Sequence, residues 1–214
     1  MPAPIGPAGV WSNFDRLPAD ELVDFARTAE SAGYDTFWTQ ETAGRDPFAL
    51  LGHLAARTLR IRLGVGIAVI HGRDPVAMRA GAATIHELSG GRMLLGLGVS
   101  HRDTVSEVRG HEYGRPLTAM REYLAAYKAA TYRGPAPHGA PPLVLAALRP
   151  RMLALAATRG DGAFPYLVPA SYVAGARRRL DEAAAGVGRA RPMLIVSQAC
   201  LLSANPEQAR AGAR

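Results

Sequence analysis

Two segments of this chain place an apolar residue at nearly every second position, with glycines between, and each predicts a buried β-strand. The first, IRLGVGI, covers residues 61–67, and the second, MLLGLG, covers 93–98. Between them, Asp74 and Pro75 supply an N-cap and a first helical residue, and Gly90-Gly91 can adopt the positive φ that ends a helix. Strand, helix and strand in this order predict parallel strands and an α/β protein.

The same unit recurs along the chain. Further strands are predicted at residues 10–12, 36–39, 143–147, 162–164 and 193–202, and further helices at about 18–33, 150–158 and 170–185. Seven strands that alternate with helices favour a TIM-type (β/α)8 barrel, whose usual number of strands is eight. A doubly wound open sheet of seven strands is the alternative.

The last residues predict a helix that is still running where the sequence stops. Asn205, Pro206 and Glu207 form an N-cap, a first-turn proline and an acidic residue suited to the helix dipole, and the sequence ends at Arg214. A barrel of this kind is usually about 250 residues long. We therefore expect a single domain over residues 1–214 from which the C-terminal helix and an eighth strand are missing.

The composition favours one cytoplasmic domain. A chain of 214 residues with 48% hydrophobic content can bury one sizeable core. No apolar run reaches the roughly 18 residues that a membrane span needs, and MPAPIGPAGV at the N-terminus does not resemble a signal peptide. The single cysteine, Cys200, falls in the predicted seventh strand and fits a reducing compartment.

The net charge of +7 does not by itself indicate a nucleic-acid partner. Of the 25 basic residues only Lys128 is a lysine, and the arginines are dispersed. The one run, Arg177 to Arg179, lies on a predicted helix, where a solvated face is favoured over a phosphate-binding patch. The net charge leaves open the binding of an anionic ligand, because a basic field concentrates anions near a cleft.

Several segments together carry a family resemblance. They are SAGYDTFWTQE at 31–41, RIRLGVGI at 60–67, RDPVAMRAGAATIHELSGGR at 73–92, MLLGLGVSH at 93–101 and VLAALRPRMLALAATRGDGAF at 144–164. They resemble the luciferase-like monooxygenase superfamily, the flavin- or deazaflavin-dependent (β/α) barrels related to bacterial luciferase. The spacing of RDPVAM, GLGVSH, RGHEYGRPL and LAALRPRMLALAA is most similar to a branch of oxidoreductases common in actinobacteria that depend on the deazaflavin coenzyme F420.

The resemblance implies an enzyme that transfers a hydride between reduced F420 and a small organic substrate of unknown identity. An FMN-dependent two-component monooxygenase of the same fold is one alternative. A non-catalytic relative that binds flavin or a partner protein is another. We expect no nucleic-acid or membrane partner, and a homodimer is left open.

Catalytic candidates follow the strands, because chemistry in a parallel barrel lies at the carboxyl ends of its strands. Glu41 follows the strand at 36–39 and can act as an acid, a base or an orienting group, with a salt bridge to Arg45 as the alternative. Many deazaflavin relatives place a histidine after this acidic residue, whereas this chain has Thr42. His101 follows LGLGVS and can donate a proton to the reduced substrate, with an ordinary loop histidine as the alternative.

Backbone and small residues are expected to hold the cofactor. Glycines at the strand ends would let a planar ring lie against the backbone, with tight packing as the alternative. The resemblance implies a non-prolyl cis peptide bond at Gly66-Ile67, and the turn before the helix at Pro150 suits a phosphate. The sequence holds no metal-ligand motif. His111 and Glu112 are weaker rim candidates, and the expected cofactor-binding residues are Gly66, Ile67, Gly98, Val99, Ser100, Ala147, Leu148 and Arg149.

Overall fold

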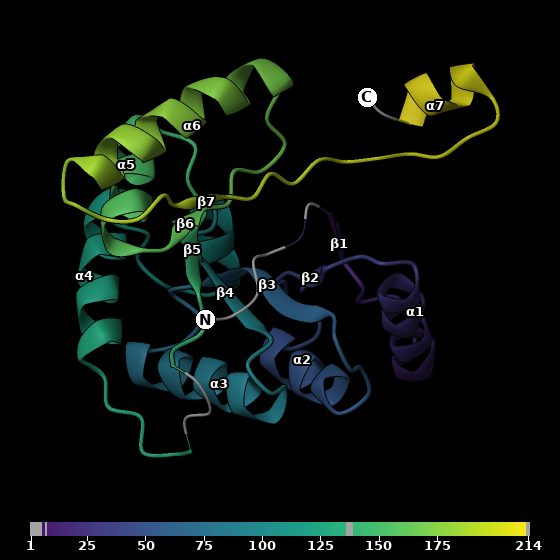
Figure 1. Cartoon of the computed structure of the whole chain (residues 1–214), viewed down its shortest axis with the longest axis horizontal. Coiled ribbons are helices and arrows are strands. Elements are labelled where there is room, and N and C mark those ends of the chain that lie inside the picture. Colours follow the sequence, from purple (N-terminus) through teal and green to yellow (C-terminus); the bar gives the residue numbers. More distant parts are fainter. Residues whose placement is uncertain (1–5, 7, 136–138, 213–214) are drawn as a thin grey trace.

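The fold is an open, curved sheet of seven parallel strands, each paired with its successor in the sequence (Figure 1). The computed structural model describes residue 6 and residues 8–135 and 139–212. Within these residues no eighth strand pairs with either edge. The strands are β1 (Gly9–Trp11), β2 (Thr36–Thr39), β3 (Arg62–Val69), β4 (Met93–Gly98), β5 (Leu143–Leu145), β6 (Gly162–Ala163) and β7 (Met193–Leu194).

This strand order confirms the barrel prediction with seven strands present. A doubly wound sheet reverses its strand order at a switch point, and the order β1 to β7 contains no reversal. The sheet is therefore an open half-barrel, and its first and last strands are edges.

Helices alternate with the strands. Their starts follow local capping signals: the Asp46 side chain accepts a hydrogen bond from the N–H of Ala49, and Asp74 accepts from the N–H groups of Val76 and Ala77. Proline fills the first turn of both helices, where its missing N–H costs nothing. The helices are α1 (Ala19–Ser31), α2 (Pro47–Ala55), α3 (Pro75–Leu88), α4 (Pro116–Ala129), α5 (Pro150–Arg159), α6 (Ala170–Ala185) and α7 (Pro206–Gly212), with a π-helical turn at Thr104–Val108.

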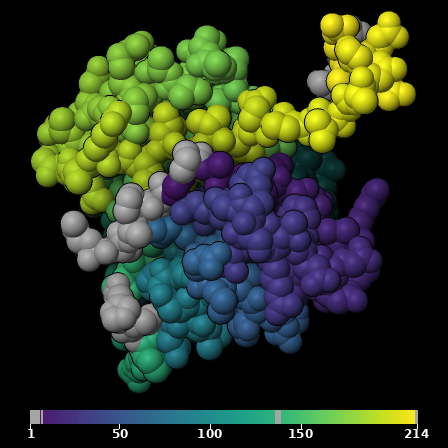
Figure 2. Space-filling model, turned by 45° about the vertical axis from the view of Figure 1, so that its right-hand side comes forward, coloured from purple at the N-terminus to yellow at the C-terminus, as the bar shows by residue number. Residues whose placement is uncertain are grey.

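The prediction of a long seventh strand at 193–202 was wrong. β7 ends at Leu194, and beyond it one isolated bridge joins Ser197 to Tyr166. Its neighbour β6 is only two residues long, so most of the predicted strand has no partner backbone. The chain then runs outward to α7, which stands off from the body (Figures 1 and 2). Cys200 accordingly lies outside any strand and is exposed.

Several other strand limits differ from the prediction by a residue or two. β1 begins and ends one residue before the predicted 10–12, β5 ends two residues early, and β6 ends one residue early. Ladder hydrogen bonding nevertheless continues past β5 and β6, because the N–H of Ala146 donates to Leu97 O and the N–H of Phe164 donates to Leu145 O. The deviations therefore concern boundaries and leave the strand pairing as predicted.

Two separate apolar clusters lie on the two faces of the sheet. The larger one joins the helices to the sheet, and it includes Leu22, Phe37, Leu51 and Leu63. The smaller one lies on the inner side of the half-barrel and has a buried centre of Trp38, Leu94, Val144 and Phe164. Alternation along the strands separates the two sets of side chains.

The strand glycines make room for the inner cluster. A Cβ at Gly64 would overlap the Trp38 ring, and one at Gly98 would lie 2.5 Å from Cδ1 of Ile67. The Trp38 and Phe164 rings are 5.0 Å apart between centroids, and Trp38 is 3% exposed. Tight packing, the alternative reading of these glycines, is thus observed at Gly64 and Gly98.

Candidate active site

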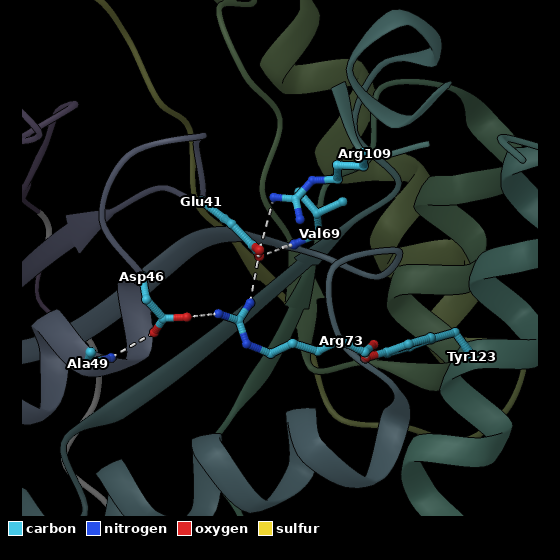
Figure 3. Close-up of polar contacts among 7 residues, drawn as sticks. All are labelled: Glu41, Asp46, Ala49, Val69, Arg73, Arg109 and Tyr123. Atoms are coloured by element: carbon cyan, nitrogen blue, oxygen red, sulfur yellow. Dashed lines mark hydrogen bonds and ion pairs between the residues drawn. The ribbon is translucent and has the colours of Figure 1, made fainter. Parts of the chain in front are cut away.

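Glu41 is the centre of a buried polar cluster at the carboxyl ends of β2 and β3 (Figure 3). Its side chain is 6% exposed. Oε1 lies 2.9 Å from Nη1 of Arg73 and 3.0 Å from Nη2 of Arg109, and Oε2 accepts a 2.8 Å hydrogen bond from the N–H of Val69. Both carboxylate oxygens therefore already have partners, and two guanidinium groups compensate the buried charge.

The prediction of a salt bridge between Glu41 and Arg45 was wrong. The backbone N–H of Arg45 donates to Asp15 Oδ1 at 3.0 Å, and its Nη1 donates to the carbonyl of Phe14 at 3.1 Å. An ion pair exists at Glu41, but its partners come from the turns after β3 and β4. The signal was present in the sequence, because Arg73 follows a strand that neighbours β2 and so had to lie at the same edge of the sheet.

The end of β3 departs from regular pairing, and the predicted bond Gly66-Ile67 is cis. The pairing register with β4 shifts at this place. The carbonyl of Gly66 accepts a 2.8 Å hydrogen bond from Nε1 of Trp11, and the carbonyl of Ile67 accepts one from the backbone N–H of Glu41 at 3.2 Å. Trp11 and Glu41 thus satisfy carbonyl groups that the interrupted ladder would leave without partners.

His101, the second catalytic candidate, lies after β4 with an exposed side chain. Its carbonyl accepts a hydrogen bond from the N–H of Val105, a residue of the π-helical turn. Within the described part of the chain, no hydrogen bond joins its imidazole to Glu41. His111 and Glu112 are also exposed. The structure therefore keeps His101 on the solvent side of the rim, apart from the buried carboxylate.

His71 is a rim residue to which the sequence assigned no role beyond its place after the third strand. It follows β3, and its ring stacks on Tyr113 with 6.0 Å between centroids. Its Nδ1 is buried, and no described residue forms a hydrogen bond with it. Burial, followed by the charges of His111 and Arg109, lowers the pKa of His71. Its position immediately after a strand was the one sequence signal that pointed to it.

The predicted phosphate turn leads into α5 as expected. Arg149 is the N-cap residue, and no side chain caps the helix. Arg149 and Arg151 are both exposed, Leu148 is 47% exposed and Ala147 is buried. The Tyr172 hydroxyl donates to the carbonyl of Leu148 at 2.7 Å and so fixes the turn. Free N–H groups at a helix start beside exposed arginines can bind an anion.

Two further observations limit the classes of site. Among the residues that the structure describes, no three His, Cys, Asp or Glu side chains are grouped so that they could hold a metal ion. In the same residues, no helix is both long and apolar enough to cross a membrane.

A parallel half-barrel whose polar side chains gather at the carboxyl ends of its strands defines a protein of the (β/α)-barrel class. Within that class the chain belongs to the luciferase-like monooxygenase family, whose model matches residues 5–214.

Relatives of known name are similar over parts of their length. A putative coenzyme F420-dependent oxidoreductase of Mycobacterium tuberculosis is 36% identical over 116 residues, which are 54% of this chain and 33% of the relative. A 5,10-methylenetetrahydromethanopterin reductase of Archaeoglobus fulgidus is 31% identical over 191 residues, covering 80% of this chain and 56% of the relative. The chain thus spans about a third of the first relative and just over half of the second.

A solved structure has the same fold. The oxygenating constituent of 3,6-diketocamphane monooxygenase from Pseudomonas putida, in complex with FMN, superposes with a TM-score of 0.72 at 16% identity. The match covers 85% of this chain and 63% of the other. At this identity the likeness shows the fold alone.

Proposed function

We propose that this chain carries the cofactor site of an oxidoreductase that transfers a hydride between coenzyme F420 and a small organic substrate. The observation that carries the proposal is the combination of two features at one edge of the sheet. Partly exposed Ile67, Ser100 and Ala146 lie at or just after the ends of three adjacent strands, and an uncapped helix start with exposed arginines lies beside them. The first suits a planar ring, and the second suits an anion.

The residues proposed for the ring fit a flat group. Ile67, Val99 and Ser100 are partly buried at the ends of β3 and β4, and Gly98 and Ala147 present little or no side chain beside them. The backbone at Gly66 and Ile67 is held by Trp11 and Glu41, so this surface is fixed before a ligand arrives. A surface that is already ordered loses little conformational entropy on binding.

The start of α5 is proposed to take the anionic part of the cofactor. No side chain caps this helix start, where Pro150 has no N–H and the N–H of Met152 donates to the carbonyl of Arg149, and Arg149 and Arg151 are exposed beside it. Two cations near a helix N-terminus suit a phosphate and an acidic tail, which is why we favour F420 over FMN.

Bound there, reduced F420 supplies a hydride, and the substrate then needs a proton. We propose that Glu41 orients the reacting groups, since both of its oxygens are occupied by partners. His101 is then the candidate proton donor, because its exposed imidazole lies on the rim. A small-molecule substrate and assembly as a homodimer belong to the same proposal.

Equilibrium titration of the purified protein with F420 and with FMN tests the proposal. We expect F420 to bind more tightly. Stronger FMN binding would contradict the choice of cofactor and favour a two-component monooxygenase, as the fold shared with an FMN complex allows. Tight binding of either cofactor without hydride transfer to any substrate would favour a non-catalytic relative.

A further inference from the structure

The two arginines that hold Glu41 differ in how firmly they are themselves held. Arg73 forms an ion pair with Asp46, its guanidinium lies 4.6 Å from the centre of the Phe48 ring, and its carbonyl accepts a 2.9 Å hydrogen bond from the Tyr123 hydroxyl. With the contact to Glu41, four contacts therefore fix Arg73 just before α3. Figure 3 draws Glu41, Asp46 and Tyr123 around it.

Arg109 approaches the same carboxylate from the other side (Figure 3). In the described chain, Glu41 is the one partner with which the Arg109 guanidinium forms a hydrogen bond or ion pair. Arg109 belongs to residues 99–115, which we call the β4–α4 segment. Most side chains of this segment are exposed, and Val105 is buried.

The backbone of the β4–α4 segment is bent at both of its ends. Positive φ angles occur at Ser100 (59°), Gly110 (67°) and Gly114 (61°). Near its end, Tyr113 returns to the rim, where its ring stacks on His71 and its hydroxyl donates to the carbonyl of Ser100 at 3.0 Å. Two side-chain contacts, Arg109 with Glu41 and Tyr113 with His71, thus tie the segment to the ends of β2 and β3.

We propose that Arg109 is a positioning residue that latches the β4–α4 segment to the rim through Glu41 and releases it when a ligand enters or leaves. Release leaves no uncompensated buried charge, because Arg73 and the N–H of Val69 stay on the carboxylate. The latch can therefore open at a fraction of the cost of breaking an isolated buried ion pair. The link to cofactor exchange rests on the proposed function, while the latch itself does not.

Gly72 offers an independent way to open the latch. A Cβ at Gly72 would lie 2.6 Å from Oε1 of Glu41 and 2.7 Å from Nη1 of Arg109. Its φ is not in the left-handed region, so alanine meets no backbone strain there. Because Arg73 is fixed by other contacts, Gly72→Ala should displace the more loosely held Arg109.

Hydrogen exchange of the ligand-free protein, followed by mass spectrometry, tests the latch. In Arg109→Gln and in Gly72→Ala, exchange over residues 100–114 should rise roughly ten- to a hundredfold, as expected for the loss of one charge-assisted contact that limits local opening. Arg109→Lys should restore part of the protection. Arg73→Gln, the matched control, should instead speed exchange around α2 and the start of α3.

F420 binding kinetics provide the second measurement. In Arg109→Gln, association and dissociation should both accelerate while the equilibrium affinity changes less, which a loss of structure would not produce. The latch would be overturned if hydrogen exchange over residues 100–114 were unchanged in both Arg109→Gln and Gly72→Ala. It would also be overturned if the rise in hydrogen exchange were spread over the whole sheet. Equal binding rates in variant and parent would overturn its role in cofactor exchange. Failure of the parent protein to bind F420 would overturn the proposed function, while the exchange data still decide the latch.

Discussion

The middle of the sheet and its open edges are built differently. β3 and β4 have eight and six residues, and both faces of the sheet are covered there. A buried carboxylate with two partly exposed arginines lies at the ends of β2 and β3. At the edges, β6 and β7 have two residues each, and a cleft of about 520 Å³ opens between β1 and β7. Its lining includes Trp11, Trp38, Phe164 and Met193, so the inner apolar cluster reaches solvent on this side.

The difference shows what complete pairing of the strands allows the protein to bury. Where long strands exclude water from both faces, a charged cluster can be buried because each charge meets its partner at hydrogen-bond distance. Where strands are short and unpaired, backbone groups and apolar side chains face solvent, and such edges favour association with other chains. Each prediction that follows changes one side of this comparison.

Replacing the buried carboxylate should have the largest effect. Glu41→Gln keeps the size of the side chain and removes the charge between Arg73 and Arg109. In F420-dependent turnover with a substrate found by screening, we expect a loss of about a hundred- to a thousandfold, the usual cost of removing one preorganised polar group beside the reaction, with F420 affinity nearly unchanged. His101→Ala tests the proposed proton donor. Full activity in both variants would contradict the proposed chemistry.

Loss of a ring from the buried centre of the inner apolar cluster should be the next largest effect. Trp38 is 3% exposed and packs against Phe164, so Trp38→Ala should lower the free energy of unfolding by about 3 to 5 kcal/mol. Met193→Ala removes a partly exposed side chain of the same cluster at the open edge, and its cost should be smaller. Urea unfolding measures both. Equal losses would show that the edge is as well packed as the centre.

The anion site at the start of α5 should show a moderate effect. Arg149→Ala should weaken F420 binding by about 1 to 3 kcal/mol if the guanidinium pairs with a charged group of the cofactor. Arg178→Ala, an exposed arginine on α6, is the control and should leave the affinity unchanged. Fluorescence titration measures the two affinities, and an unaltered value for the Arg149 variant would remove this one contact from the site.

The smallest effect expected is the contribution of His71 to the pH dependence of the free energy of unfolding. Burial and the neighbouring charges of His111 and Arg109 lower the pKa of His71 below its usual 6.5. The native state therefore binds fewer protons there than the unfolded chain, so this group's contribution to stability is complete above pH 6.5 and is lost as the pH falls through the lowered pKa.

Thermal unfolding at several pH values measures this contribution. The parent protein should lose more stability on acidification below pH 6.5 than His71→Gln, which cannot titrate at this position. Parallel curves for the two proteins would show that His71 is not the group concerned. His53→Gln on α2 serves as a matched histidine control.

The sequence by itself determined the order of the strands and the limits of α3, whereas α2 and α4 were not predicted although α2 carries the same Asp-Pro start. Asp74, Pro75 and the Gly90-Gly91 pair place α3 within one or two residues, because caps and positive φ depend on a residue and its nearest neighbours. Strand alternation likewise located β3 and β4, and the family resemblance located the cis bond within β3.

Only the tertiary structure decided the length of β7 and the partners of Glu41. A strand lasts as long as a neighbour offers its backbone, so an apolar run at 193–202 became a strand only beside β6. Glu41 meets Arg109, which is 68 positions away in the sequence, because folding brings the ends of parallel strands to one edge. Arg45, the nearest arginine in the sequence, binds Asp15 and Phe14 instead. Capping depends on local sequence, whereas strand pairing and buried ion pairs depend on which distant residues the fold brings together.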